Sequence, residues 1–188
     1  MNFWTKLIKK AATQFVSQLH PALYSKRAKI YLKNMDSKIV KLFGRNHAGG
    51  NNIFHDIVRE GSLTLLRRID EKVDAPIDVL LRECNNRGDT CITSARNVYP
   101  LQRAIDLVDI LVRIGADINS KNEFTGNTLL HYGVYKKKYK LITWLCAQPG
   151  IDLSVQNNAK FTPFDLAVHL KSEKIMDLFY AVLIFKKT

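Results

Sequence analysis

Apolar residues recur at three- and four-residue steps along most of the chain, a spacing that predicts short amphipathic helices. The clearest stretch spans 124–154, where Gly126-Asn-Thr-Leu-Leu-His131 is followed by a second apolar face over 139–146. Thr128 stands where a helix N-cap belongs, because its hydroxyl accepts from an otherwise unpaired amide two or three residues on. Gly126 permits the tight turn before it. The stretch therefore predicts a helix-turn-helix unit that needs neighbours to bury its apolar faces.

The same pattern occurs elsewhere in the chain. Upstream lie Gly50-Asn-Asn-Ile-Phe-His55 and Gly88-Asp-Thr90-Cys-Ile-Thr93. Gly61 is expected to end the helix that contains His55. Downstream, Thr162-Pro163-Phe-Asp165 places proline at the first helical position, where its missing N–H is harmless. If His55, Thr93, His131 and Asp165 are equivalent, the intervals between them are 38, 38 and 34 residues. We therefore predict an all-α solenoid of about four helix-turn-helix repeats, at roughly 50–80, 86–119, 124–154 and 158–185.

These motifs resemble the ankyrin-repeat family, whose period is about 33 residues. The similarity is carried by Thr-x-Leu-His at 128–131, Thr-Pro-Phe at 162–164 and Gly-Ala-Asp-Ile-Asn at 115–119. The segments 50–57, 83–90 and 126–149 further resemble the IκB-like viral ankyrin proteins of polydnaviruses (bracoviruses), which parasitoid wasps carry. The resemblance covers roughly 49–180. It implies an ankyrin-repeat domain, which we place at 46–188, after a helical extension over 1–45.

The recurring histidines have a structural and a chemical interpretation. A catalytic or metal role would need a second ligand or a nucleophile nearby, yet the equivalents of His55 and His131 are Thr93 and Asp165. In the ankyrin family this histidine hydrogen-bonds between repeats and to the cap threonine, so we favour the structural interpretation. The residues expected to build the repeats in this way are Gly50, His55, Gly88, Thr90, Gly115, Gly126, Thr128, His131, Thr162 and Pro163.

Two repeats carry insertions. In the first, Asp74-Ala-Pro-Ile-Asp78 breaks the pattern and is expected to form a loop or an added helical turn. In the second, extra residues around 97–101 lengthen the link between the helices.

The positive charge is concentrated at the N-terminus. The chain has a net charge of +12, and residues 1–45 hold ten Lys or Arg against one acid, Asp36. Residues 3–19 read as an amphipathic helix with a lysine face, and 22–43 carry a second helical pattern. Three interpretations of 3–19 compete: a cap on the open end of the repeat stack, a membrane-surface helix, and an organelle-targeting helix. We favour the cap.

The composition points to a packed domain without catalytic chemistry. Hydrophobic residues make up 46% of the 188 positions, but no apolar run is long enough for a membrane span. The three cysteines, Cys84, Cys91 and Cys146, show no metal-binding spacing, so we expect buried thiols and an intracellular setting. No phosphate-binding loop or hydrolase motif occurs, and we expect no catalytic residue, no cofactor and no metal.

An ankyrin-type stack recognises proteins through a concave surface formed by its first helices and hairpin tips. The tip candidates for partner binding are Asn85, Asn86, Arg87, Lys121, Asn122, Glu123, Phe124, Gln156, Asn157 and Asn158. Phe124 has two interpretations, an interface anchor or a residue packed on the neighbouring hairpin, and both stay open. The lysine run in 135–139 is interpreted as a solvated turn in preference to a nuclear-import or nucleic-acid patch.

The resemblance implies an IκB-like inhibitor that binds host Rel/NF-κB factors in the host-cell cytoplasm, or in the nucleus, and suppresses the immune response. No Asp-Ser-Gly-x-x-Ser phosphorylation signal occurs in the sequence. Because the chain is basic, attraction to basic Rel surfaces would depend on apolar fit or on the local acids Asp56, Glu60, Asp106 and Asp109. The alternatives are an adaptor tethered to a membrane by 3–19 and a nucleic-acid binder using the basic arm; direct nucleic-acid binding is not expected.

Overall fold

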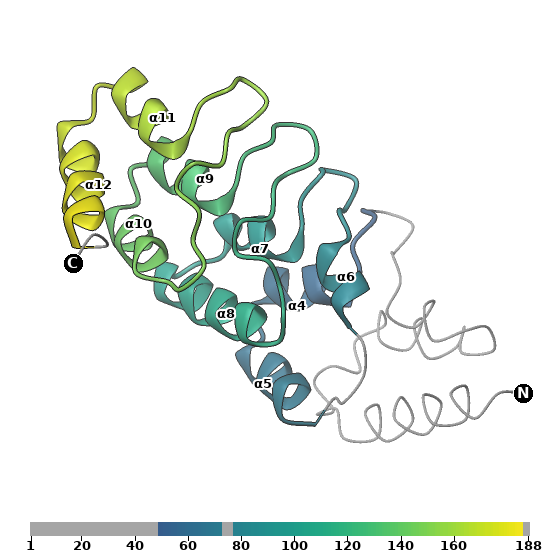
Figure 1. Cartoon of the computed structure of the whole chain (residues 1–188). Helices are drawn as coiled ribbons and strands as arrows, with labels where there is room; N and C mark the ends of the chain where they lie inside the picture. The colour runs from purple at the N-terminus through teal and green to yellow at the C-terminus, as the bar shows by residue number, and fades with distance from the viewer. Residues whose placement is uncertain (1–48, 73–76, 186–188) are drawn as a thin grey trace, which may run out of the picture.

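The computed structural model describes residues 49–72 and 77–185 (Figure 1). Within these ranges the chain is helical and contains no strand, and no helix is long and apolar enough to cross a membrane. The helices are α4 (Ile53–Glu60), α5 (Leu63–Lys72), α6 (Asp78–Arg82), α7 (Cys91–Ser94), α8 (Leu101–Arg113), α9 (Leu129–Tyr135), α10 (Tyr139–Cys146), α11 (Pro163–His169) and α12 (Glu173–Phe185), with a 3-10 turn η2 (Ala95–Asn97) after α7. The extension predicted over 1–45, including the helix at 3–19, lies outside the described residues.

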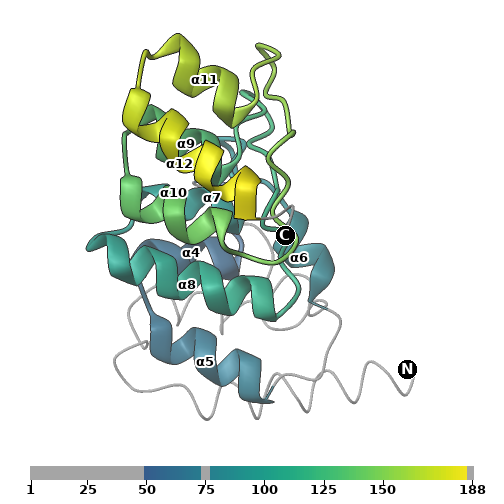
Figure 2. The ribbon, with the colours of Figure 1, turned by 60° about the vertical axis from the view of Figure 1, so that its left-hand side comes forward.

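The helices form two layers. One layer contains α4, α7 with η2, α9 and α11, and the other contains α5, α8, α10 and α12, each helix packing on its neighbour in the layer. Figure 2 shows α5, α8, α10 and α12 stacked one above another, with the loops that join the repeats along the opposite edge. We call the layer of α4, α7, α9 and α11 the inner layer and the layer of α5, α8, α10 and α12 the outer layer. This arrangement confirms the predicted all-α ankyrin-repeat fold.

The hydrophobic core lies between the two layers. The apolar face of each helix points toward the other layer, so the core is one continuous layer of buried side chains from α4 to α12. Its largest fully buried members include Phe54, Leu66, Ile92, Leu107, Leu111, Leu130, Leu145 and Phe179. Burial of one such side chain contributes about 1.5–3 kcal/mol relative to exposure. No repeat has an enclosed core of its own, so each depends on its neighbours.

Side-chain caps start the inner helices at the positions that the repeat motif predicts. Asn52, Thr90, Thr128 and Thr162 are the N-cap residues of α4, α7, α9 and α11, and each accepts from the amide three residues on. Such a cap contributes about 0.5–2 kcal/mol. Pro163 is the first residue of α11, and Gly61 ends α4 in the left-handed conformation. The starts of the inner helices are therefore marked by local side-chain chemistry as well as by packing.

Both insertions have structural consequences. In the first repeat the short helix α6 begins at Asp78, the last residue of the segment predicted as a loop or an added helical turn. Residues 73–76 lie outside the described ranges, so both alternatives for the segment stay predictions. In the second repeat α7 has only four residues and continues as η2 before α8 begins at Leu101. The longer link is thus real, and it sets Tyr99 on the surface.

Glycine is required where one loop passes over the previous one. Gly126 has a φ of +68°, and a Cβ there would lie 2.6 Å from the backbone nitrogen of Asn158. That nitrogen donates to the Thr125 carbonyl at 3.0 Å, so it cannot move away without losing the bond. Gly50 repeats the arrangement, with a φ of +63° and 2.8 Å to the Asn86 nitrogen. These glycines allow both the turn and the close stacking of loops.

Gly126→Ala is expected to cost more stability than a positive φ alone explains. The backbone conformation accounts for about 1 kcal/mol, and the contact with the Asn158 backbone adds about 1–3 kcal/mol. Gly150→Ala is the matched control, because Gly150 has a φ of +79° but nothing within 4 Å of the added Cβ. Urea unfolding of the two variants measures the difference. Equal losses of unfolding free energy in the two variants would show that the loops are not closely stacked at Gly126.

Candidate functional site

Asparagines fix the loops that form one wall of the concave surface. Asn122 accepts from the amides of Phe124 and Thr125 at 3.1 and 3.0 Å, and donates to the Arg87 carbonyl of the previous loop at 2.8 Å. Asn85 accepts from two amides of its own loop and donates to Asn51 at 2.9 Å. Each asparagine therefore shapes its own loop and ties it to the one before.

The two repeat histidines tie each helix to the following loop. His131 Nε2 lies 2.9 Å from the Phe161 carbonyl, and its Nδ1 lies 2.9 Å from the Thr128 hydroxyl. His55 Nε2 lies 2.7 Å from the Asp89 carbonyl. Since a carbonyl only accepts, Nε2 carries the proton in both rings. Burial is the main cause that lowers the pKa of each histidine, and Lys121 adds to it at His131. Both histidines thus make the hydrogen bonds between repeats that the structural interpretation expects, His131 with the cap threonine and His55 with the cap Asn52.

The second repeat replaces its histidine by another linkage. Thr93 is too short to reach the next loop, and the buried carboxylate of Asp89 takes over. Asp89 Oδ1 accepts from Asn122 Nδ2 of the next loop at 2.7 Å, and it also pairs with the Arg96 guanidinium. A buried carboxylate is stable only when it is paired and hydrogen-bonded, which Arg96 and Asn122 together ensure. Arg96 is thereby held at the concave surface.

A groove of about 360 Å³ runs along the concave surface between the loops and the inner helices. Phe124, Arg87 and Thr125 line it from the loops, while Arg96, Tyr132 and Tyr135 line it from η2 and α9. Phe124 and Tyr135 are 62% and 59% exposed, which is unusual for aromatic side chains. We call this the inner groove. No Asp or Glu is among the described residues that line it.

Cations and tyrosines interleave at one end of the inner groove. The Lys138 ammonium lies 5.1 Å from the ring centroids of both Tyr99 and Tyr132, and it donates to the Arg96 carbonyl at 3.3 Å. Arg96 itself lies 5.9 Å over the Tyr132 ring, and Lys136 lies 5.0 Å from the Tyr135 centroid. Such contacts hold a cation in place while leaving its outer face open to a ligand. We name these residues, Arg96, Tyr99, Tyr132, Tyr135, Lys136 and Lys138, the basic-aromatic patch.

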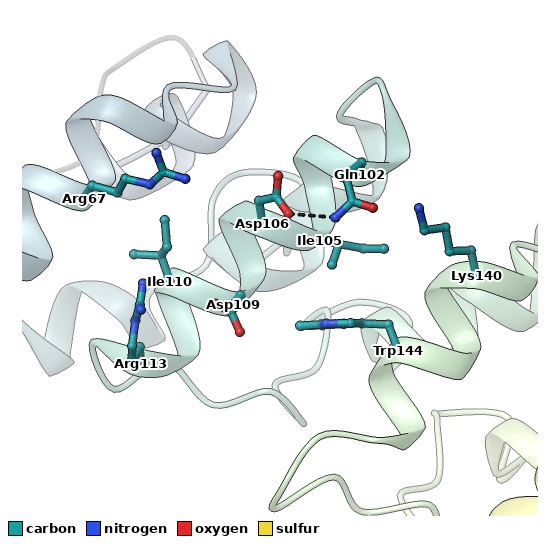
Figure 3. A pocket seen from close by; sticks show the side chains of 9 residues that line it. All are labelled: Arg67, Gln102, Ile105, Asp106, Asp109, Ile110, Arg113, Lys140 and Trp144. Carbon is teal, nitrogen blue, oxygen red and sulfur yellow. Dashed lines mark hydrogen bonds between the residues drawn. The ribbon is translucent and has the colours of Figure 1, made fainter.

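A second groove, of about 460 Å³, lies on the outer layer. Figure 3 shows Arg67 on α5, a row of side chains on α8, and Lys140 and Trp144 on α10, with the Trp144 ring directed toward α8. Asp106 accepts from Gln102 Nε2 at 2.8 Å. Here cations and carboxylates alternate, so the charges largely offset one another. The inner groove, with unbalanced positive charge and exposed aromatics, is the better candidate for a partner site.

The chain is similar to viral I-Kappa-B like proteins. I-Kappa-B like protein H1 of Microplitis demolitor bracovirus (isolate Webb) is 29% identical over 181 residues, which cover 95% of this chain and 93% of the relative. I-Kappa-B like protein C2 of the same virus is 36% identical over 137 residues, covering 71% of this chain and 73% of the relative. No family model matches. The chain belongs to the bracovirus IκB-like ankyrin proteins.

The structure divides the tip residues of this IκB-like chain into two groups. The side chains of Asn85 and Asn122 are only 6% and 5% exposed, and their polar atoms form hydrogen bonds within and between the loops. These side chains are therefore not free for a partner. Asn157 is half-buried and bonded in the same way. The remaining tip candidates, Asn86, Arg87, Lys121, Glu123, Phe124, Gln156 and Asn158, are exposed. The Phe124 ring lies against Gly88 of the previous hairpin, as the packing interpretation expects, and its 62% exposure leaves the interface-anchor interpretation a prediction.

Three residues of the basic-aromatic patch, Tyr135, Lys136 and Lys138, fall in the run 135–139 that was interpreted as a solvated turn. In this IκB-like chain Lys138 is half-buried beside the rings of Tyr99 and Tyr132. Tyr132 and Tyr135 lie three residues apart on the face of α9 that the buried Leu130 and Val134 leave free, a spacing that places them side by side. That spacing was a usable signal. Arg96 and Tyr99 gave none, because their positions follow from the irregular link of the second repeat.

The structure also shows how the cysteines and the possible metal ligands of this IκB-like chain are placed. Within 49–72 and 77–185, no three His, Cys, Asp or Glu side chains are grouped so that they would hold a metal ion. Cys91 and Cys146 are buried, as expected, and Cys84 is half-buried. Burial raises the pKa of the Cys91 thiol to about 12, so it stays protonated and unreactive at neutral pH.

Acidification is expected to destabilise the fold through the histidines. The folded pKa of His55 and of His131 lies below that of an exposed histidine, so the unfolded chain binds more protons as the pH falls below about 6.5. Stability is therefore fully present above that pH and decreases as the pH falls toward the folded pKa. Each histidine contributes a slope of at most about 1.4 kcal/mol per pH unit. Urea unfolding between pH 7.5 and 5.5 measures it, and His131→Gln should flatten the profile; an unchanged slope would contradict the assignment.

Proposed function

We propose that this chain is an IκB-like inhibitor that binds host Rel/NF-κB factors through its ankyrin repeats and so suppresses the host immune response. The single observation that carries the proposal is the inner groove, with its exposed Phe124 and Tyr135 beside Arg87 and Arg96. Aromatic and arginine side chains dominate the binding energy of protein interfaces. Membership of the IκB-like family supports a Rel factor as the partner. The proposed location is the host-cell cytoplasm, with the nucleus as the alternative.

The proposed mechanism is occlusion. A Rel factor has a basic nuclear-import segment and a basic DNA-binding face, and a bound ankyrin stack that covers either blocks import or DNA binding. The local acids considered for direct attraction lie away from the inner groove. Asp56 and Glu60 both pair with Arg59 on α4, while Asp106 and Asp109 lie among cations in the outer groove. We therefore propose that apolar fit in the inner groove anchors the factor, and that the rest of the stack covers the basic surface beside it.

The proposed role requires no catalysis. The described residues form stacked helices whose polar groups are used in caps, loops and ion pairs, and the buried side-chain polar atoms among them all have hydrogen-bond partners. A buried polar group without a partner would have been a candidate for chemistry. A binding protein needs only a stable surface, which the linked loops supply.

Binding to a Rel-homology domain is expected to depend on the inner groove. The full chain should co-precipitate the domain and compete with its DNA probe, and Phe124→Ala and Tyr135→Ala should each weaken the complex about tenfold or more, as for interface anchors. Ile184→Ser is the matched control, because Ile184 is an apolar residue with 66% exposure that lies on α12 and does not line the inner groove. Competition titrations give the affinities.

Circular dichroism of each variant establishes that the fold is retained. A folded wild-type chain that neither precipitates the domain nor displaces the probe would remove the Rel assignment. Equal weakening by Ile184→Ser would remove the inner groove as the binding site.

A further inference from the structure

The inner groove has a one-sided charge. Arg87 lines it, and Lys136 and Lys138 lie beside the lining rings of Tyr135 and Tyr132. None of these three cations is paired with a carboxylate among the described residues. Arg96 is the exception, since Asp89 partly neutralises it from below. Glu123 is exposed at a loop tip and is not part of the lining. A partner that enters the groove therefore meets cations without bound counter-charges.

The cations are held by the tyrosines. The Lys138 ammonium is fixed by two rings and one carbonyl, and Lys136 is fixed by the Tyr135 ring. Rings attract a cation but do not neutralise it, so the charge stays available to an anion. Fixing the side chains before binding reduces the entropy lost when they meet a ligand. This is the arrangement of a prepared anion-binding surface.

We propose that the inner groove binds an acidic segment of its protein partner, rich in Asp or Glu and carrying apolar residues. Carboxylates of the segment meet Arg87, Lys136 and Lys138, and its apolar side chains contact Phe124 and Tyr135. The inference deepens the proposed function and rests on it only for the location of the site. It identifies the bound part of a Rel factor as an acidic surface, not the basic import segment. Like charges facing each other across the groove disfavour the basic segment.

The same contacts distinguish a protein from a nucleic acid. Single strands bind to basic surfaces by stacking bases on free aromatic faces. In the basic-aromatic patch, cations already lie near the rings of Tyr99, Tyr132 and Tyr135. The Tyr132 phenol has an ordinary pKa of about 10, which burial raises further, so its hydroxyl is protonated at neutral pH and can donate. A carboxylate uses both the cations and such donors, whereas a base competes with the cations for the rings.

The test uses fluorescence anisotropy with the full chain and three probes. These are a short fluorescein-labelled peptide of Glu and Leu, the matched peptide of Lys and Leu, and a single-stranded uridine oligonucleotide of equal length. The acidic peptide should bind at low salt, about tenfold or more tighter than either of the others. If the oligonucleotide bound more tightly than the acidic peptide, and the peptide displaced it from the same groove, the proposal would be overturned in favour of a nucleic acid.

Matched charge reversals locate the site, because residues 1–45 are also basic and would attract the acidic peptide by themselves. Lys136→Glu should lower the affinity for the acidic peptide about tenfold, and Lys138→Gln should lower it about fivefold. Lys140→Glu is the control, because it makes the same charge change in the outer groove and should alter binding less than about twofold. Equal effects of Lys136→Glu and Lys140→Glu would overturn the proposal, since binding would then follow net charge alone.

A parallel titration with the Rel-homology domain separates this inference from the proposed function. Displacement of the acidic peptide by the domain supports both. If the domain fails to bind while the peptide shows the pattern above, the Rel assignment fails and the acidic-segment inference stands. If the domain binds and is unaffected by Lys136→Glu, the inhibitor role stands and the inference is wrong.

Discussion

Hydrogen bonds between neighbouring loops hold the repeats of this protein in register. His55 and His131 each donate to a carbonyl of the following hairpin, and the loop asparagines donate back to the previous one. The loops have little apolar side chain of their own to bury, so without these bonds their polar backbone groups would be left without partners wherever water is excluded. The bonds also fix the spacing of the loop tips. The wall of the inner groove therefore follows from the linkage between repeats.

Periodicity and caps predicted most of the fold. The helix pairs follow from apolar spacing, and Thr128, Thr162 and Gly61 mark their ends by local chemistry that needs no tertiary contact. The loops were harder. Asn85 and Asn86 are adjacent and identical in type, yet one turns inward to bond the loop and the other faces solvent. Only the path of the neighbouring loop decides between them, and that path is a property of the stack.

Only part of the binding surface could be predicted from the sequence, for a similar reason. Apolar spacing identifies the buried face of α9 well, but it leaves the free face with no signal beyond the presence of Tyr132 and Tyr135. Phe124 and Arg87 were found because hairpin tips are recognisable from glycine and polar residues. The patch as a whole depends on contacts across repeats, such as Lys138 with Tyr99. Residues this far apart in sequence meet only through the packing of the second repeat on the third.

The second repeat shows how a departure from the repeat motif creates the surface. Replacing histidine by Thr93 removes a link to the next loop, and Asp89 restores it with a buried carboxylate. That carboxylate requires a cation, which is Arg96, and the guanidinium then lies over Tyr132. The lengthened link also brings Tyr99 beside Lys138. Structural compensation for one missing histidine thus places Arg96 and part of the aromatic patch beside the groove. Arg96 is therefore tied to the stability of the stack, because a variant that neutralised it would leave Asp89 buried without its cation, at a cost of about 3–5 kcal/mol.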